Sequence, residues 1–199
     1  MPTAEEIQEV LPGCYTWQAF CSQAKVLLTS HAIVSSNEFY LVDPIRLSKN
    51  GLEQLAEVKQ QPTAVLLTNG NHERDAAFYR DYFSIPVFAH PQAAKEFSFA
   101  TEGFPQQLGS LEIISLPGAG IGEIGIYDRD KKMLCLGDMI INLDSFPFAP
   151  LPDKYATNKK QMRKSIASLT ALNVRTICFA HGLPVTIKAM EKIEALITG

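Results

Sequence analysis

Polar residues that can do chemistry follow four apolar, strand-like segments of this chain. They lie in 69–75 (Asn-Gly-Asn-His-Glu-Arg-Asp), in the glycine-containing segment 117–122, in Gly137-Asp138 and in 180–182 (Ala-His-Gly). Loops at strand ends, held by a rigid scaffold, are where active sites usually form. Carboxylate and imidazole side chains at such positions can bind zinc, manganese or iron. Asp138 and His181 could also act as an acid–base pair without a metal.

The composition of the chain limits the class of protein and the kinds of partner that these residues could serve. The chain has 199 residues, of which 46% are apolar and 20% charged, values typical of a folded globular protein. We expect residues 1–199 to form a single domain. The net charge of −3 offers no basic field for nucleic acid, and no apolar stretch is long enough to span a membrane. We therefore expect neither a nucleic-acid nor a membrane partner.

The number and spacing of the cysteines bear on the cellular compartment in which the protein is expected. Cys14, Cys21, Cys135 and Cys178 fit neither a CxxC nor a zinc-finger spacing. Together with an N-terminus that lacks a secretion signal, this favours a reduced, cytoplasmic protein. A Cys14–Cys21 disulfide is the open alternative and would be unusual in that compartment. Cys135 lies within an apolar strand and is expected in the core.

The hydrophobic pattern predicts elements that could position these loops. Strands are expected at 25–34 and 38–42 (a hairpin), 64–67, 85–89, 111–116, 123–127 and 132–136 (a second hairpin) and 176–179. Helices are expected at 49–60, after Asn71, at 91–97, from near Asn158 and from Pro184. Residues 139–156, with three prolines, are expected to form a long irregular loop. The order of elements suggests two similar halves, that is, two mixed sheets with helices outside, in the α/β or α+β class.

The order of the polar loops resembles the metallo-β-lactamase superfamily. In that family a strand ends in Thr-His-x-His-x-Asp-His, and Pro-Gly-His, Gly-Asp and His-Gly loops follow. The matching segments here are 67–75, 116–119, 136–138 and 180–184. The resemblance covers nearly the whole chain and implies a four-layer αββα sandwich. It also implies a metal-dependent hydrolase acting on an ester, thioester, amide or phosphoester.

The metal ligands implied by the resemblance are largely replaced. The first metal position would be built from Asn69, Asn71, Ala119 and Asp138, where the family has histidines at the first three. An amide is a poor zinc ligand and alanine is none, so we expect that position to be empty. The second would draw on Glu73, Arg74, Asp138 and His181. Because Arg74 cannot offer a lone pair, we predict that an Arg74–Asp138 ion pair replaces the metal, with Glu73 and His181 hydrogen-bonded around it.

The leading hypothesis is a degenerate member of the fold without a working dinuclear site and without a cofactor. It would bind a small molecule or a partner protein through a cleft lined by Asn69, Asn71, His72, Glu73, Arg74 and Ala119. The alternative is a hydrolase with one divalent metal (zinc, manganese or iron) on Glu73, Asp138 and His181, assisted by His72. Phe146, Phe148 and Tyr155 in the loop could cover a pocket or pack against a second subunit, so a homodimer is one of the expectations.

Several of these residues also have ordinary structural interpretations. Asp138 could be a turn residue, His181 a hydrogen-bonded loop histidine, and Glu73 an acidic residue favoured in the first turn of a helix. His72 falls at a variable position of the family pattern. On a helix it would point about 100° away from Glu73, so we expect it to be structural or solvent-facing. His31 and His90 are expected to be structural.

Overall fold

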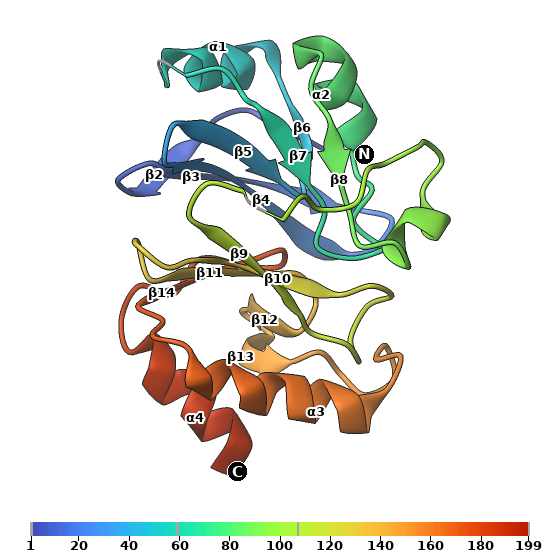
Figure 1. Cartoon of the computed structure of the whole chain (residues 1–199), viewed down its shortest axis with the longest axis vertical. Coiled ribbons are helices and arrows are strands. Elements are labelled where there is room, and N and C mark those ends of the chain that lie inside the picture. Colours follow the sequence, from blue (N-terminus) through green and yellow to red (C-terminus); the bar gives the residue numbers. More distant parts are fainter. Residues whose placement is uncertain (1, 59, 107, 199) are drawn as a thin grey trace.

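The computed structural model describes residues 2–58, 60–106 and 108–198. Helices, a larger sheet, a smaller sheet and further helices are stacked in four layers, in that order (Figure 1). This is the αββα sandwich that the sequence predicted.

The larger sheet has six strands in the order β2-β3-β4-β5-β7-β8. They are β2 (Gln8–Leu11), β3 (Cys14–Cys21), β4 (Val26–Ser35), β5 (Glu38–Val42), β7 (Ala64–Leu66) and β8 (Val87–Phe88). The predicted hairpin is β4 and β5, which pair antiparallel, whereas β7 joins β5 in parallel. Beside this sheet, β1 (Thr3–Ala4) pairs with β6 (Arg46–Leu47). The pattern gave no prediction for the strands before residue 25.

The smaller sheet has four strands in the order β14-β11-β10-β9. They are β9 (Leu111–Ser115), β10 (Ile124–Asp128), β11 (Met133–Leu136) and β14 (Thr176–Phe179). The second predicted hairpin is β10 and β11, and β14 joins β11 in parallel. The prediction for these four strands is confirmed.

Helices cover the outer faces of both sheets (Figure 1). They are α1 (Lys49–Glu57) and α2 (Ala76–Phe83) on the larger sheet, and α3 (Lys159–Ser168) and α4 (Ala189–Thr198) on the smaller. The segments η1 (Ala93–Glu96) and η2 (Leu169–Ala171) are short 3-10 turns. The helices predicted from Asn71 and Pro184 begin later, at Ala76 and Ala189. No helix in the described ranges is long and apolar enough to cross a bilayer.

The hydrophobic core consists of three apolar clusters, each of which lies between two neighbouring layers. One apolar cluster, with Leu55 and Tyr79, packs α1 and α2 against the larger sheet. A second, with Met162 and Ile193, packs α3 and α4 against the smaller sheet. A third lies between the sheets and contains Cys14, Cys135 and Cys178. All four cysteines are unpaired and buried, so the Cys14–Cys21 disulfide does not form and Cys135 is in the core, as predicted.

The prediction of an irregular loop at 139–156 is wrong. This segment contains β12 (Ile140–Leu143) and β13 (Phe146–Pro150), which pair antiparallel with a register shift. The two strands form a sheet of their own. Pro147 and Pro150 are tolerated because an outer strand does not need every backbone N–H for pairing.

Candidate functional site

The site lies where two pairs of parallel strands end. In the smaller sheet, Leu136 of β11 is in register with Phe179 of β14, so Asp138 and His181 each lie two residues beyond paired positions. In the larger sheet, Val42 of β5 is in register with Leu66 of β7. Asp43 and the loop that starts at Thr68 therefore leave that sheet side by side. The sandwich brings the two groups of strand ends together.

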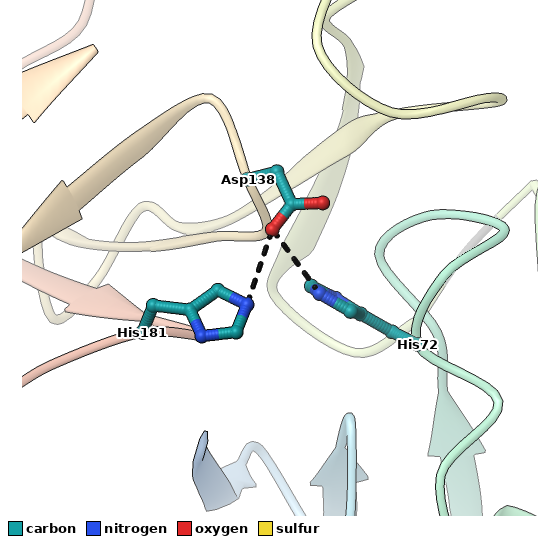
Figure 2. A group of neighbouring side chains, drawn as sticks. All are labelled: His72, Asp138 and His181. Carbon is teal, nitrogen blue, oxygen red and sulfur yellow. Dashed lines mark ion pairs between the residues drawn. The ribbon is translucent and has the colours of Figure 1, made fainter. Parts of the chain in front are cut away.

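Figure 2 shows the three side chains that meet there, His72, Asp138 and His181. The Asp138 Oδ1 atom is 3.3 Å from His72 Nε2 and 3.2 Å from His181 Nε2. One potential ligand atom from each residue lies within 4.8 Å of the others. The sequence had predicted Asp138 and His181 for this group, but it had predicted His72 to be structural or solvent-facing.

Asp43 and Thr68 hold the His72 ring in place. His72 Nδ1 lies 2.9 Å from Asp43 Oδ2 and 2.8 Å from Thr68 Oγ1. The Thr68 hydroxyl donates to Asp43 Oδ2 at 2.5 Å, and the Thr68 N–H donates to Oδ1 at 2.8 Å. Because an ionised carboxylate only accepts, Nδ1 of His72 carries a hydrogen. A neutral His72 therefore directs the lone pair of Nε2 at Asp138.

The His181 ring also directs its Nε2 atom at Asp138, but a backbone carbonyl holds it in place. Its Nδ1 lies 3.1 Å from the carbonyl oxygen of Leu27, which can only accept, so Nδ1 is the donor. The Nε2 atoms of both histidines and Oδ1 of Asp138 thus present lone pairs to one point. His72 Nε2 is buried and has no hydrogen-bond partner of acceptable geometry among the described residues. Such a convergence needs a cation, either a proton on an imidazole or a metal ion.

The charges around this point are strongly coupled. Burial alone would lower the pKa of His72, but the carboxylates of Asp43 and Asp138 outweigh it and raise the pKa to about 9. Burial likewise opposes ionisation of Asp138, yet the two imidazoles hold the pKa of that carboxyl well below its usual range. Without a metal, a protonated His72 between two carboxylates is the favoured state.

The predicted Arg74–Asp138 ion pair does not form. The Arg74 guanidinium is buried and donates to the carbonyl oxygens of Thr29 (2.6 Å), Asp43 (2.7 Å) and Ala180 (3.1 Å). Arg74 has a φ of 44°, in the left-handed region, so the chain is not helical there. The guanidinium therefore joins three chain segments from both halves of the fold, and does not take the place of a metal at Asp138.

Glu73 is also absent from the group. It is half-buried, and its carboxylate accepts hydrogen bonds from the backbone N–H of Ser98 (3.1 Å) and from the Ser98 hydroxyl. It precedes α2 and is not in its first turn. Glu73 therefore does not join Asp138 and His181 as expected, and the residue that lies beside them is His72.

Two of the residues predicted for the first metal position, Asn69 and Asn71, lie beside the other oxygen of Asp138. The amides of Asn69 and Asn71 donate to Asp138 Oδ2 at 3.1 and 3.3 Å. Ala119 is fully buried and packs in the core beneath the smaller sheet. Asn69 is likewise fully buried, whereas Asn71 is exposed.

Glu123 is a site residue that the sequence did not reveal. Its carboxylate accepts from the backbone N–H groups of Asp138 (2.7 Å), Met139 (3.1 Å) and Gly120 (3.0 Å). It also accepts from the Asn69 amide at 2.8 Å. Burial and the charge of Asp138 raise its pKa to about 8, while these four donors favour the carboxylate. In the sequence Glu123 only precedes a strand, and Asp43 only ends one, so nothing local marked either.

A pocket of about 560 Å³ opens above the group. Its lining includes Asn71, His72, Arg74, Asp138 and His181, all of which the sequence had assigned to a cleft or a site. Its walls are the β3–β4 turn on one side and the β12–β13 hairpin with 151–155 on the other. A volume of several hundred Å³ suits a small molecule.

Comparison with solved structures identifies the fold. A metallo-β-lactamase from Pontibacter korlensis superposes with a TM-score of 0.74 at 15% identity, covering 98% of this chain and 99% of that one. One from Erythrobacter litoralis, with β-mercaptoethanol in its active site, gives 0.74 at 18% identity, covering 96% and 95%. The DIM-1 metallo-β-lactamase gives 0.75 at 15% identity, covering 99% and 97%.

This chain therefore has the metallo-β-lactamase fold over its whole length. No protein-family model matches the sequence. No curated protein matches it either. At 15–18% identity, the likeness to these structures extends to the architecture alone.

Proposed function

We propose that this protein is a hydrolase-like member of the fold that uses one divalent metal ion, held by His72, Asp138 and His181. The observation that carries the proposal is the buried Nε2 of His72, which has no hydrogen-bond partner within the described structure and faces Asp138. Two histidines and a carboxylate are a ligand set for zinc, iron or manganese. Bonds of about 2.0–2.1 Å to a tetrahedral zinc place neighbouring donors about 3.3 Å apart. The separations of 3.3 and 3.2 Å between Asp138 Oδ1 and the two Nε2 atoms support such a fit, and all three atoms lie within 4.8 Å of one another.

The surrounding residues support the same proposal. Metal-binding histidines usually donate their second nitrogen to a carboxylate or a carbonyl, as His72 does to Asp43 and His181 to Leu27. The pocket reaches all three ligands and leaves room for a substrate. His72, Asp138 and His181 would hold the ion, which would supply Lewis-acid polarisation of a carbonyl or phosphoryl group. The chain itself supplies the orientation of the ligands, the apolar walls and the amide of Asn71.

We propose that the centre is mononuclear. Asp138 Oδ2 is engaged by the amides of Asn69 and Asn71. Ala119 offers no donor atom where the family has a histidine. These substitutions support the loss of the first metal position predicted from the sequence.

A second candidate is a metal-free protein that binds a small molecule or a partner in the same pocket. It is favoured by those two amides, because they partly satisfy Asp138 without a metal, and by His72, which can bridge Asp43 and Asp138 as an imidazolium. Under this proposal no cofactor is needed.

Metal content separates the two candidates. The protein would be produced with zinc, manganese and iron in the medium, purified without chelator, and analysed for metals. We expect about one metal per chain, lost in both His72→Ala and His181→Ala and kept in His90→Ala, a control outside the site. Circular dichroism would verify that each variant is folded. Less than roughly 0.1 metal per chain in the folded wild type would overturn the first candidate in favour of the second.

A further inference from the structure

The walls of the pocket above the proposed metal site are apolar. Val26, Leu28, Ile141, Leu143, Phe146 and Leu151 line it. Leu28 and Ile141 are buried at its base, whereas Phe146 is 48% exposed and Tyr155 is 63% exposed. Large exposed aromatic side chains at the mouth of an apolar pocket are typical of ligand-binding surfaces.

The base of the pocket has little cationic charge to offer a ligand. Apart from histidines, the described cationic side chains that line the pocket are Arg74 and Lys25. Arg74 donates three hydrogen bonds to backbone carbonyl oxygens, which hold its guanidinium in the fold, and Lys25 is exposed in the β3–β4 turn. The carboxyl of Asp138 lines the pocket, and those of Asp43 and Glu123 are buried behind it, in contact with His72 and Asn69. A phosphate with two negative charges would therefore find little cationic charge here besides a bound metal ion.

A neutral donor is available beside the metal ligands. Asn71 is exposed, lines the pocket, and uses one N–H of its amide on Asp138 Oδ2 at 3.3 Å. Its amide group has a second N–H, which suits a carbonyl oxygen that gains partial charge during a reaction.

We infer that this site takes a neutral carboxylic ester with an apolar acyl chain and not a phosphoester. The inference rests on the proposed function for its chemistry and on the pocket for its specificity. In the reaction one water is added across the ester. The acyl carbon gains the water oxygen, and its bond to the alcohol oxygen breaks. One water proton goes to the departing alkoxide, and the new acid releases the other to solvent.

Ligand preference is tested first by binding, which needs no turnover. The probes are 2-octanone, a neutral carbonyl with a hexyl chain, hexyl phosphate, which carries the same chain on a dianion, and acetone, which lacks the chain. Each would be titrated into metal-loaded and chelator-treated protein and followed by ¹H–¹⁵N NMR. We expect 2-octanone to bind roughly tenfold more tightly than either of the other two. Equal or tighter binding of hexyl phosphate would overturn the inference.

Turnover is tested with p-nitrophenyl hexanoate, p-nitrophenyl acetate and p-nitrophenyl phosphate. Phe146→Ser should lower kcat/KM for the hexanoate roughly tenfold relative to kcat/KM for the acetate. Phe20→Ser is the matched control, since Phe20 is 61% exposed and lies outside this pocket. Hydrolysis of the phosphate alone, or no effect of chain length, would contradict the inference.

The two tests separate this inference from the proposed function. Metal content reports on the centre, whereas 2-octanone binding to chelator-treated protein reports on the pocket alone. A protein that holds metal but does not bind 2-octanone keeps its proposed centre and overturns the ester assignment. A protein that binds 2-octanone but never holds metal supports the ligand preference and overturns the metal-dependent function.

Discussion

His72 Nδ1 lies 2.9 Å from Asp43 Oδ2, and this contact joins the ends of the neighbouring strands β5 and β7 to the candidate site. Both side chains are buried. The contact fixes the direction of the His72 ring and thereby aims its other nitrogen at Asp138, on the smaller sheet. One carboxylate therefore links the stability of the larger sheet to the geometry of the site.

Removing the charge of Asp43 should lower both the stability of the fold and the affinity of the site for a metal ion. In Asp43→Asn, His72 and Arg74 lose a buried countercharge, and the free energy of unfolding should fall by about 3 kcal/mol. Affinity for the metal should fall roughly tenfold or more, because the second nitrogen of His72 is no longer held by a carboxylate. Urea denaturation and metal titration would measure the two effects. In Asp81→Asn, which alters an exposed pair with Arg80, both quantities should stay almost unchanged.

Replacing Arg74 by lysine should destabilise the fold although the charge is kept. A lysine ammonium cannot reproduce the planar fork that reaches Thr29, Asp43 and Ala180 together. We expect a loss of about 2 kcal/mol, measured by thermal or chemical unfolding. Arg80→Lys is the control, because that side chain pairs with Asp81 at the surface. If Arg74→Lys were as stable as this control, the bracing role of Arg74 would be wrong.

His31 should make the protein acid-sensitive. It is fully buried between Thr16 Oγ1 (2.9 Å) and the Phe179 carbonyl oxygen (3.0 Å), and burial lowers its pKa to about 4. Since the unfolded state binds the proton more tightly, this stabilising contribution is complete above about pH 6.5 and is lost as the pH falls toward 4.

The shift corresponds to about 3 kcal/mol between those pH values. His31→Gln should remove this part of the pH dependence, as measured by urea unfolding at several pH values. His90→Gln, at a partly exposed position outside the site, should keep the wild-type slope. An unchanged slope in His31→Gln would show that His31 does not cause the acid sensitivity.

Gly182 should not tolerate a side chain. It follows His181 and has a φ of 108°, and a Cβ built there would lie 1.8 Å from the Asn142 carbonyl oxygen. In Gly182→Ala the β12–β13 hairpin or the His181 loop must move, so we expect a loss of about 3 kcal/mol. Gly103→Ala is a matched control, since nothing lies within 4 Å of its Cβ position. Comparable melting temperatures for the two variants would refute this prediction.

The sequence by itself determined the architecture and half of the site. Alternating and continuous apolar runs predicted β4, β5, β7, β9–β11 and β14, because burial imposes its periodicity on each element. The Gly-Asp and His-Gly segments predicted that Asp138 and His181 would meet, and parallel strands in register bring them together. These features are local, or they follow from strand order. The hairpin at 140–150 was not predicted because prolines usually argue against a strand. Its two strands pair with each other in a small sheet of their own, where prolines are tolerated.

Only the tertiary structure decided which residue of the segment 72–74 enters the site. A helical backbone would have separated His72 from Glu73 by about 100° and favoured Glu73. Instead, the left-handed φ of Arg74 ends that periodicity before α2 begins. Asp43, 29 residues away, then orients His72, Ser98 binds Glu73, and three carbonyls bind Arg74. The direction of each of these three side chains depends on residues that are distant in the sequence. A local sequence pattern cannot reveal such partners.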